Sequence, residues 1–404
     1  HNMPPEYGHL NRHYNIAKQL KKRNYNPVVF VGSSLHNTDK QIIEKNKLYT
    51  KYPSCDFDYI FVKTCHYQKN MKKRIISMLQ FYHRLFKVVK DFELPDVIIG
   101  SSAHPLSALA AIKLSKKYHC KNIVEIRDLW PESLIEYGII KKNSLLSKIL
   151  YQGEKYLYKK ADQLVFSMEG GKQYIIDKGW DKEHGGSIDT NKVHHINNGI
   201  VLDDFEYNKS HYQIDDPDLK CSDFFKAVYI GSIRKVNHLG MLVDVAKKLK
   251  TDGYNKIQIL VYGDGNEKEM LEKRCIDEGI DNLIFKGSVD KKDIPYLLSQ
   301  CDLNLMHGGT MNLGRYGISP NKSFDYLASG KPILSDITCN YDYIEKNNAG
   351  LTVENSIDTI EEGLIQFSLL TKDHYQEMCK NAKETAKQYD FSVLTEKLIE
   401  IIES

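Results

Sequence analysis

Long apolar runs are absent from this sequence of 404 residues. No stretch of about 18 or more apolar residues occurs, which excludes a transmembrane helix. The eight cysteines are scattered without a Cys-x-x-Cys pair, so a disulfide framework and a structural zinc site are not expected. Reduced thiols instead predict a cytoplasmic protein. No Gly-x-Gly-x-x-Gly motif opens a helix with an acid downstream, which excludes a Rossmann dehydrogenase. No Asp-x-Asp pair occupies a plausible metal-binding position, so no cofactor is expected.

The net charge is small but unevenly distributed. It is +3, with 41% hydrophobic and 27% charged residues, as in a soluble globular protein. Residues 1–205 carry about 32 Lys and Arg against 21 Asp and Glu, roughly +11. Residues 206–404 carry about 24 against 32, roughly −8, and the two halves sum to +3. This asymmetry indicates that the N-terminal half faces an anionic partner, unless it reflects only a composition rich in Lys.

Short β-branched and apolar runs alternate with longer helical patterns. In a chain of this length, the alternation predicts two α/β domains with parallel sheets. We expect an N-terminal domain over residues 1–202, a linker over 203–225, a C-terminal domain over 226–390 and a final helix over 391–404. The first recognisable element is a loop, Pro4–Gly8, and a helix from Asn11 follows it, so the first strand of this domain is expected to be missing. The predicted strands are Pro27–Gly32, Tyr59–Val62, Asp96–Ser101, Asn122–Ile126, Gln163–Ser167, Lys226–Gly231, Ile257–Tyr262, Leu283–Phe285, Leu303–Met306 and Pro332–Ser335.

One predicted helix in the C-terminal half carries charged residues near its start. Ser319 is a suitable N-cap, Pro320 suits the first helical position, and Gly330 ends the helix. Lys322 and Asp325 are three residues apart and therefore share one face. The helix N-terminus follows a glycine-bearing loop and can bind an anion, with Lys322 placed for a phosphate and Asp325 for ribose hydroxyls. A capped helix with a solvated charge pair is the alternative.

This segment resembles the nucleotide-sugar signature of family 4 glycosyltransferases. In that family two acidic residues eight positions apart flank a glycine loop, and Asp325 matches the second acid, which binds the ribose. The first acid would fall at Gly317 and is absent, as in a subgroup that acts on bacterial surface polysaccharides such as capsule and O-antigen. The resemblance implies that donor contacts there pass to the backbone amides of Gly317 and Ile318 and to Arg315.

Three further segments match the family in the same order along the chain. Gly231 lies in a segment that resembles the turn opening the donor domain. Arg234 and Lys235 stand near, but displaced from, the positions where the family places diphosphate-binding cations. Gly263 belongs to a glycine turn after the second strand, and Val289 to a loop that binds the base through backbone groups. Four segments in this order make the resemblance specific.

The N-terminal half adds candidates at the ends of predicted strands, where ligands bind in open α/β sheets. The family places a histidine at His104, which orients an acceptor hydroxyl or contacts the sugar, although a lone histidine is more often structural. Arg127 and Asp128 resemble an acceptor-side motif of the surface-polysaccharide subgroup, with an ion pair supporting Trp130 as the alternative. Gly8 matches the loop that approaches the donor phosphates.

The resemblance covers nearly the whole chain. It implies a GT-B fold: two facing Rossmann-like domains with parallel sheets and an active-site cleft between them. Residues 196–200, Ile-Asn-Asn-Gly-Ile, resemble the family's hinge, with Asn197 in place of a proline.

The implied activity is that of a retaining, metal-independent hexosyltransferase. It would move sugar from a UDP- or GDP-sugar to a lipid-linked saccharide acceptor, with no nucleic-acid partner. The implied catalytic residues are His104, Arg234, Lys235 and Lys322. A UDP-sugar epimerase of the same fold and a non-catalytic nucleotide-sugar-binding protein are the alternatives.

A basic and then apolar segment predicts contact with an anionic membrane. Lys69, Lys72, Lys73 and Arg74 precede apolar residues at helical spacing, a composition typical of a helix lying in the membrane interface. We expect docking on the cytoplasmic face, where a lipid-linked acceptor is found. A core-facing helix with a solvated basic turn is the alternative. The apolar residues are Ile75, Met78, Leu79, Tyr82, Leu85 and Phe86.

Overall fold

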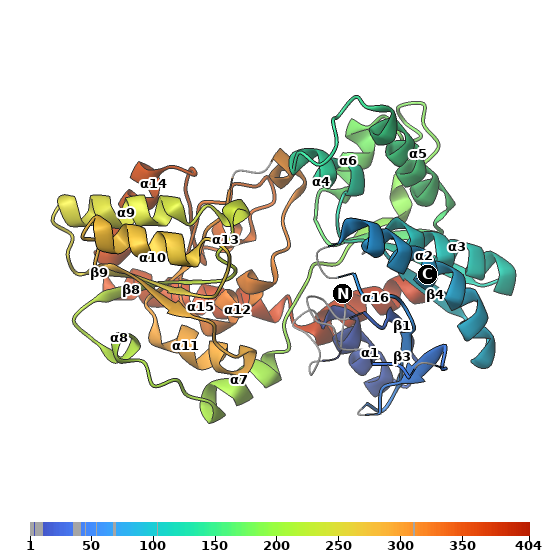
Figure 1. The fold of residues 1–404 in the computed structure, drawn as a ribbon, viewed down its shortest axis with the longest axis horizontal. Helices are drawn as coiled ribbons and strands as arrows, with labels where there is room; N and C mark the ends of the chain where they lie inside the picture. The colour runs from blue at the N-terminus through green and yellow to red at the C-terminus, as the bar shows by residue number, and fades with distance from the viewer. Residues whose placement is uncertain are drawn as a thin grey trace. The chain divides into compact units, whose positions relative to one another are not determined.

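The chain forms two compact units (Figure 1). The computed structural model describes residues 4, 11–34, 42–44, 46–53, 55–67, 70–102, 104–309 and 312–404. The N-terminal unit comprises residues 1–197 together with 391–404, and the C-terminal unit comprises residues 198–390. No helix in the described part of the chain combines the length and the apolar character needed to cross a bilayer.

The described strands of the N-terminal unit form two hydrogen-bonded sheets. In the first, of order β1-β3-β2, β1 and β3 are parallel and β2 is antiparallel to β3. In the second, of order β4-β5-β6-β7, all neighbours are parallel. Successive side chains of β5 are buried, as in a parallel strand covered on both faces. The strands are β1 Val28–Gly32, β2 Tyr49–Lys51, β3 Asp58–Val62, β4 Val97–Ser101, β5 Lys121–Ile126, β6 Gln163–Phe166 and β7 Val193–His195.

The last helix of the chain, α16 (Phe391–Glu403), packs in the N-terminal unit against α1. Lys121 Nζ donates to the carbonyl oxygen of Ile401 at 2.6 Å, where the negative end of the helix dipole favours a cation. Arg23 pairs with Glu396 at 2.5 Å. The other helices are α1 Arg12–Lys22, α2 Met71–Val88, α3 Pro105–Tyr118, α4 Trp130–Glu136, α5 Leu145–Lys160 and α6 Gly171–Asp177.

The C-terminal unit contains a parallel sheet of order β10-β9-β8-β11-β12-β13. Helices α9 and α10 cover one face and α7, α8 and α11 the other (Figure 1). The strands are β8 Phe225–Ile230, β9 Ile257–Tyr262, β10 Leu283–Gly287, β11 Leu303–Met306, β12 Ile333–Ser335 and β13 Gly350–Thr352. The helices are α7 Leu202–His211, α8 Pro217–Lys220, α9 Gly240–Thr251, α10 Lys268–Asp277, α11 Ile294–Gln300, α12 Asn321–Ser329, α13 Tyr343–Lys346, α14 Ile357–Ser368 and α15 Lys372–Lys387.

Alternation along β9 divides the core of the C-terminal unit between the two faces of the sheet. Ile259 and Val261 pack on the side of α9 and α14, whereas Leu260 and Tyr262 pack on the side of α11 and α12. Because both faces are buried, the strand is apolar throughout. This core fixes the carboxyl ends of β8, β9 and β11, from which the candidate site residues project.

The segment expected to be a linker, residues 203–225, instead belongs to the C-terminal unit and contains most of α7 and all of α8. Phe205 and Leu219 are buried in its core. Asp216 accepts a hydrogen bond from the buried hydroxyl of Tyr262 at 2.7 Å. Two buried apolar residues in a polar stretch are too few to give a periodic pattern, so the sequence did not predict that this segment packs on the C-terminal unit.

Candidate functional site

Glycines bring two loops of the C-terminal unit together at the carboxyl edge of its sheet. Gly231 follows β8, whereas Gly263 and Gly265 follow β9. A Cβ at Gly263 would lie 1.8 Å from the carbonyl oxygen of Gly231, and a Cβ at Gly265 would lie 2.0 Å from that of Ile233. Only glycine permits this approach, so Gly231 and Gly263 first serve to build the edge. Their contact with a donor stays a prediction.

The loop predicted to bind the base lies next to these turns. Gly263 N donates to the carbonyl oxygen of Gly287 at 2.8 Å, and Gly231 N donates to that of Tyr262 at 3.0 Å. Val289 follows β10 by two residues and is partly buried against the core. The loops after β8, β9 and β10 are therefore neighbours at the sheet edge where ligands bind in such folds.

The predicted signature helix is α12, which begins at Asn321. Pro320 rather than Ser319 occupies the N-cap position, and no side chain there caps the helix. The hydroxyl of Ser319 instead accepts a hydrogen bond from Asn198 N at 2.9 Å. Gly330 ends the helix with φ +68, as its sequence predicts. The N–H groups of the first turn thus have no N-cap side chain, which suits an anion site.

Lys322 projects from the first turn of α12 and is partly buried. Its Nζ lies 4.2 Å from the ring centroid of Tyr229 and donates to the carbonyl oxygen of His307 at 3.3 Å. Burial lowers the pKa of Lys322 to about 8, and the nearby carboxylate of Asp336 partly opposes this shift. An ammonium with three donors and this environment gains from an anionic ligand.

Asp325 lies one turn further along α12 and is partly buried. Its carboxylate accepts no hydrogen bond from any residue that the structure describes. Burial raises its pKa to about 6, and Lys291 pulls in the opposite direction. A desolvated carboxylate without donors is costly unless a ligand supplies them, which is the property expected of a group that binds ribose hydroxyls.

The loop before α12 explains the absent first acid. Gly317, at that position, has φ +89 and donates its N–H to Gly314 O at 2.8 Å. A residue with a side chain is strained in this backbone conformation, so the loop is built for glycine. Ile318 is partly buried, and the exposed Arg315 places its guanidinium 4.7 Å from the ring centroid of Tyr316.

Arg234 and Lys235 lie on the turn after β8, where both side chains are exposed. Neither side chain forms a hydrogen bond or an ion pair with the part of the chain that the structure describes. Asn237, two residues on, donates instead to the hydroxyl of Tyr229 at 2.9 Å. Tyr229 thereby links this turn to Lys322, whose ammonium lies over its ring. The two exposed cations are available to a ligand but are not fixed by the fold.

A buried His–Asp pair beside Lys322 escaped prediction from the sequence. His307 Nδ1 lies 2.5 Å from Asp336 Oδ2, and Asn355 Nδ2 donates to the same oxygen at 2.7 Å. Gly308 N donates to the other carboxylate oxygen at 3.1 Å. His307 follows β11 and Asp336 follows the neighbouring β12, so the available signal was a polar residue directly after each of two buried strands. The pair fixes the backbone that holds Lys322.

In the N-terminal unit, His104 is the N-cap residue of α3, after β4. Its ring meets that of Phe81 edge-on, with centroids 6.0 Å apart. Its Nδ1 is buried without a hydrogen-bond partner among the described residues. Burial lowers the pKa of His104 to about 4, and Arg74 acts in the same direction. A neutral imidazole with so low a pKa suits orientation of a hydroxyl better than its deprotonation.

Arg127 and Asp128 directly follow β5. Arg127 is partly buried, and this burial lowers the pKa of its guanidinium against the opposing charge of Glu125. Asp128 is exposed. Trp130 is held by Ser102, whose carbonyl oxygen accepts from the indole Nε1 at 3.0 Å. Trp130 is thus supported from the end of the neighbouring strand β4. The acceptor-side role of Arg127 and Asp128 stays a prediction.

Glu125 forms a buried ionic cluster that no motif indicated. It accepts from Arg12 Nε, from His13 Nε2 and from the hydroxyl of Ser101, each at 2.7 Å. Although burial raises its pKa, Arg12 and His13 hold the pKa of Glu125 well below its ordinary value. The cluster fixes the start of α1 against β4 and β5. Gly8, predicted to approach the phosphates from the loop before α1, lies outside the described residues.

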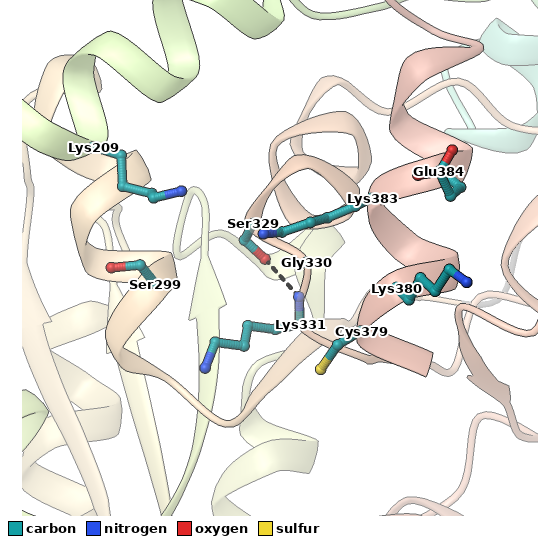
Figure 2. A pocket seen from close by; sticks show the side chains of 9 residues that line it. All are labelled: Lys209, Ser299, Ser329, Gly330, Lys331, Cys379, Lys380, Lys383 and Glu384. Carbon is teal, nitrogen blue, oxygen red and sulfur yellow. Dashed lines mark hydrogen bonds between the residues drawn. The ribbon is translucent and has the colours of Figure 1, made fainter. Parts of the chain in front are cut away.

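A hollow of about 490 Å³ lies at the opposite, carboxyl end of α12 (Figure 2). Lys209 and Lys383 extend toward it from opposite sides, whereas Lys380 points away. A Cβ at Gly330 would lie 2.4 Å from Lys383 Cε, so this lysine covers the end of the helix. Cations gather favourably at a helix C-terminus, which accounts for these lysines. We therefore place the candidate site at the amino end of α12, with Lys322 and Asp325.

The described residues contain no group of three or more His, Cys, Asp or Glu side chains arranged to hold a metal ion. The charged groups at the amino end of α12 are Lys322 and Asp325, on one helix face. This arrangement fits a ligand with both an anionic part and hydroxyl groups.

Comparison with known proteins finds similarity to glycosyltransferases. Residues 214–388 match the family model described as glycosyl transferases group 1. WbjE of Pseudomonas aeruginosa, described as a probable glycosyltransferase, is 20% identical over 70% of this chain and 68% of its own length. TuaH of Bacillus subtilis, described as a putative teichuronic acid biosynthesis glycosyltransferase, is 24% identical over 55% of this chain and 52% of its own length.

Among solved structures, HepE of Anabaena in complex with UDP matches the fold with a TM-score of 0.60 and 12% identity. The match covers 85% of this chain and 86% of HepE. The predicted α/β class, with Rossmann-like parallel sheets of the GT-B type, is therefore confirmed.

Proposed function

We propose that this chain, as a member of the group 1 glycosyltransferases of family 4 with the GT-B fold, transfers a hexose from a UDP- or GDP-sugar. The proposed acceptor is a hydroxyl of a lipid-linked saccharide, and the configuration at the anomeric carbon is retained. The family makes the chain a nucleotide-sugar-dependent glycosyltransferase. The sugar, base, acceptor and stereochemistry are the proposed part. The assignment of the chain to bacterial surface polysaccharide synthesis is supported by the relative TuaH, which is named for teichuronic acid biosynthesis.

The observation that carries the proposal is the pair of groups on α12. Asp325 is a desolvated carboxylate without donors of its own, and Lys322 is a desolvated ammonium near the helix N-terminus. We assign the ribose hydroxyls to Asp325 and the diphosphate to Lys322. Gly317 and Ile318 offer backbone amides, and Arg315 and the loops at Gly231, Gly263 and Val289 border the same sheet edge. HepE was solved with UDP, which supports uracil as one possible base of the donor nucleotide.

The proposed reaction breaks the bond between the anomeric carbon and the diphosphate oxygen and forms a bond from that carbon to the acceptor oxygen on the same face. The electron pair of the broken bond stays on the diphosphate, and the hydroxyl proton passes to the leaving phosphate oxygen. The negative charge that grows there is stabilised by Lys322, with Arg234 and Lys235 from the exposed turn, in place of a metal ion. The N-terminal unit supplies His104, Arg127 and Asp128 on the acceptor side, where the neutral imidazole orients the hydroxyl.

Docking on an anionic membrane at the cytoplasmic face is the second part of the proposal. Helix α2 exposes Met71, Ile75, Ile76 and Leu79, with exposed fractions of 55%, 52%, 47% and 43%. Lys72 and Lys73 on the same helix are exposed, and Arg74 is partly buried. Apolar residues that protrude beside lysines favour the interface of an anionic bilayer.

The sequence pattern of α2 predicted that its apolar residues share one exposed face, but in the structure only some of them are exposed. Leu85 is buried, and Tyr82 and Phe86 pack against the core of the N-terminal unit. Ile75 and Leu79 are exposed instead. The second half of α2 therefore packs inward, as the core-facing alternative predicts, whereas its first half presents apolar groups to solvent, which supports the membrane proposal. Lys69 lies outside the described residues.

A thermal-shift panel with UDP-, GDP- and ADP-sugars tests the donor, and a transfer assay with the stabilising donor and membrane-extracted acceptor tests the reaction. We expect one nucleotide-sugar to raise the melting temperature and its sugar to appear on the lipid fraction. Conversion of the donor without an acceptor would identify an epimerase instead. Donor binding with neither reaction would identify a non-catalytic protein.

A further inference from the structure

Asn198 forms a two-point contact with the residue that precedes the N-cap of α12. Its backbone N donates to Ser319 Oγ at 2.9 Å, and its side-chain Nδ2 donates to the Ser319 carbonyl oxygen at 2.7 Å. Asn198 is 6% exposed, so both bonds are shielded from water. The two residues are 121 positions apart, and both belong to the C-terminal unit.

The backbone around Asn198 is itself held in place. Two residues on, Ile200 N donates to Tyr389 O at 3.0 Å. Leu202 N donates to Asp390 Oδ2 at 2.9 Å. Residues 198–202, where the chain enters the C-terminal unit, are therefore bonded to 389–390, where it leaves that unit. The backbone that carries Asn198 is therefore held in place by hydrogen bonds of its own, independently of the contact with Ser319.

The N-terminal unit holds the preceding residue in the same way. Arg12, paired with the buried Glu125, donates to the carbonyl oxygens of Asn197 and, at 3.0 Å, of Ile196. Two consecutive residues are thus each bonded to a different unit, Asn197 to the first and Asn198 to the second. The chain passes between the units at the peptide bond that joins them.

The start of α12 depends on this contact because its own N-cap offers little. Pro320 has neither an N–H group nor a polar side chain, and no side-chain capping bond is formed there. Within the helix, Ser323 Oγ donates to the Pro320 carbonyl oxygen at 2.7 Å. On the side that precedes the helix, Ser319 is the nearest residue whose polar groups can fix the direction in which the helix begins. Lys322 and Asp325 project from the first two turns beyond it. A small rotation of the first turn moves both groups relative to the glycine loops.

We infer that Asn198 is a positioning residue for donor recognition, which fixes the amino end of α12 through Ser319 so that Lys322 and Asp325 meet the donor together. The inference rests on the proposed donor site. It assigns a role to the second asparagine of the Ile-Asn-Asn-Gly-Ile segment, and it links the segment between the units directly to the donor-binding helix.

Donor affinity and amide hydrogen exchange of α12 are measured for Asn198→Ala, Asn198→Asp and a matched control, Asn282→Ala. Asn282 has the same chemistry in the same unit: it is 7% exposed, and its Nδ2 donates to Ala246 O at 2.8 Å. It precedes β10, at the opposite edge of the sheet. The Asp variant keeps the shape of Asn198 but cannot donate to the carbonyl.

Both Asn198 variants are expected to raise the donor dissociation constant about 3- to 10-fold, because each loses one hydrogen bond. Both should also speed amide hydrogen exchange in peptides that span residues 320–327. Asn282→Ala is expected to lower the melting temperature without either effect. In an Asp325→Ala background, Asn198→Ala is expected to weaken donor binding less than it does in the parent, because it acts through Asp325.

Equal effects of the Asn198 and Asn282 variants on donor affinity would overturn the inference, as would full additivity with Asp325→Ala together with unchanged exchange. The exchange measurement needs no donor. If the parent binds no nucleotide-sugar but exchange in 320–327 still rises in Asn198→Ala, the proposed donor function fails while the positioning of α12 stands.

Discussion

Replacing Asp325 by Asn is expected to make the protein more stable and the donor bind more weakly. Burial raises the pKa of this carboxyl from 3.8 to about 6, so the folded chain holds a proton between about pH 4 and 6 that the unfolded chain releases. Ionisation of Asp325 therefore costs stability above pH 6, and the cost disappears below about pH 4. The neutral amide of Asn removes this cost at pH 7.5.

The magnitude follows from the shift. About two pKa units correspond to about 3 kcal/mol, and solvent screening at this partly exposed position reduces the gain to about 1–2 kcal/mol. For a unit of this size, that gain raises the melting temperature by about 2–6 °C. In the complex, losing a charged acceptor for ribose hydroxyls costs about 1.5–3 kcal/mol, which weakens the donor by about 10- to 150-fold.

Melting curves at pH 7.5 and pH 4 measure the first effect, and titration calorimetry with the stabilising nucleotide-sugar measures the second. Asp373→Asn, an exposed aspartate on α15 of the same unit, is the control and should change neither quantity. The stability gain should shrink at pH 4, where the parent carboxyl is also neutral. A variant that is less stable than the parent at pH 7.5, or that binds donor equally well, would refute the assignment of Asp325.

Lys322→Ala is expected to lower kcat by about 100-fold with a smaller change in donor affinity, since the ammonium stabilises charge that grows in the transition state. In the parent, turnover should fall as pH rises through the pKa of Lys322 at about 8, and a flat profile from pH 7 to 9 would contradict this role. Gly263→Ala should destabilise the C-terminal unit by more than about 2 kcal/mol, because the new methyl group would lie 1.8 Å from Gly231 O, and chemical denaturation measures the loss. EDTA should leave transfer intact, and complete loss restored by Mg²⁺ or Mn²⁺ would show that a metal does the work assigned to side chains. Charge reversal at Lys69, Lys72, Lys73 and Arg74 should abolish sedimentation with anionic liposomes and leave donor binding unchanged. A parent that does not sediment even at low salt would remove the membrane proposal.

Local pattern was sufficient for the long elements of the fold. Runs such as Ile257–Tyr262 and Leu303–Met306 are apolar because both faces of a parallel strand are buried, and the structure has strands at those residues. The strands β2, β7 and β13 were not predicted, since each has three residues and only partial burial. Runs that short carry no usable periodicity.

The candidate site was predictable where residues close in sequence act together. Lys322 and Asp325 share a helix face through the geometry of one turn, and Gly330 ends that helix because only its left-handed backbone fits. The N-cap was misplaced by one residue, because the polar groups of Ser319 are engaged by Asn198 rather than by the helix alone. That choice depends on a partner 121 residues away.

Sequence by itself thus determined the strand–helix alternation, the glycine turns and the charged helix face, since each depends on backbone preferences and side-chain periods within a few residues. Tertiary structure alone decided the rest. Three features depend on which distant groups the fold brings together away from water. They are the pairing of His307 with Asp336, the ionic cluster of Arg12 and Glu125, and the raised pKa of Asp325. Desolvation and long-range hydrogen bonds are properties of the packed chain, because a local segment is fully hydrated until distant residues cover it.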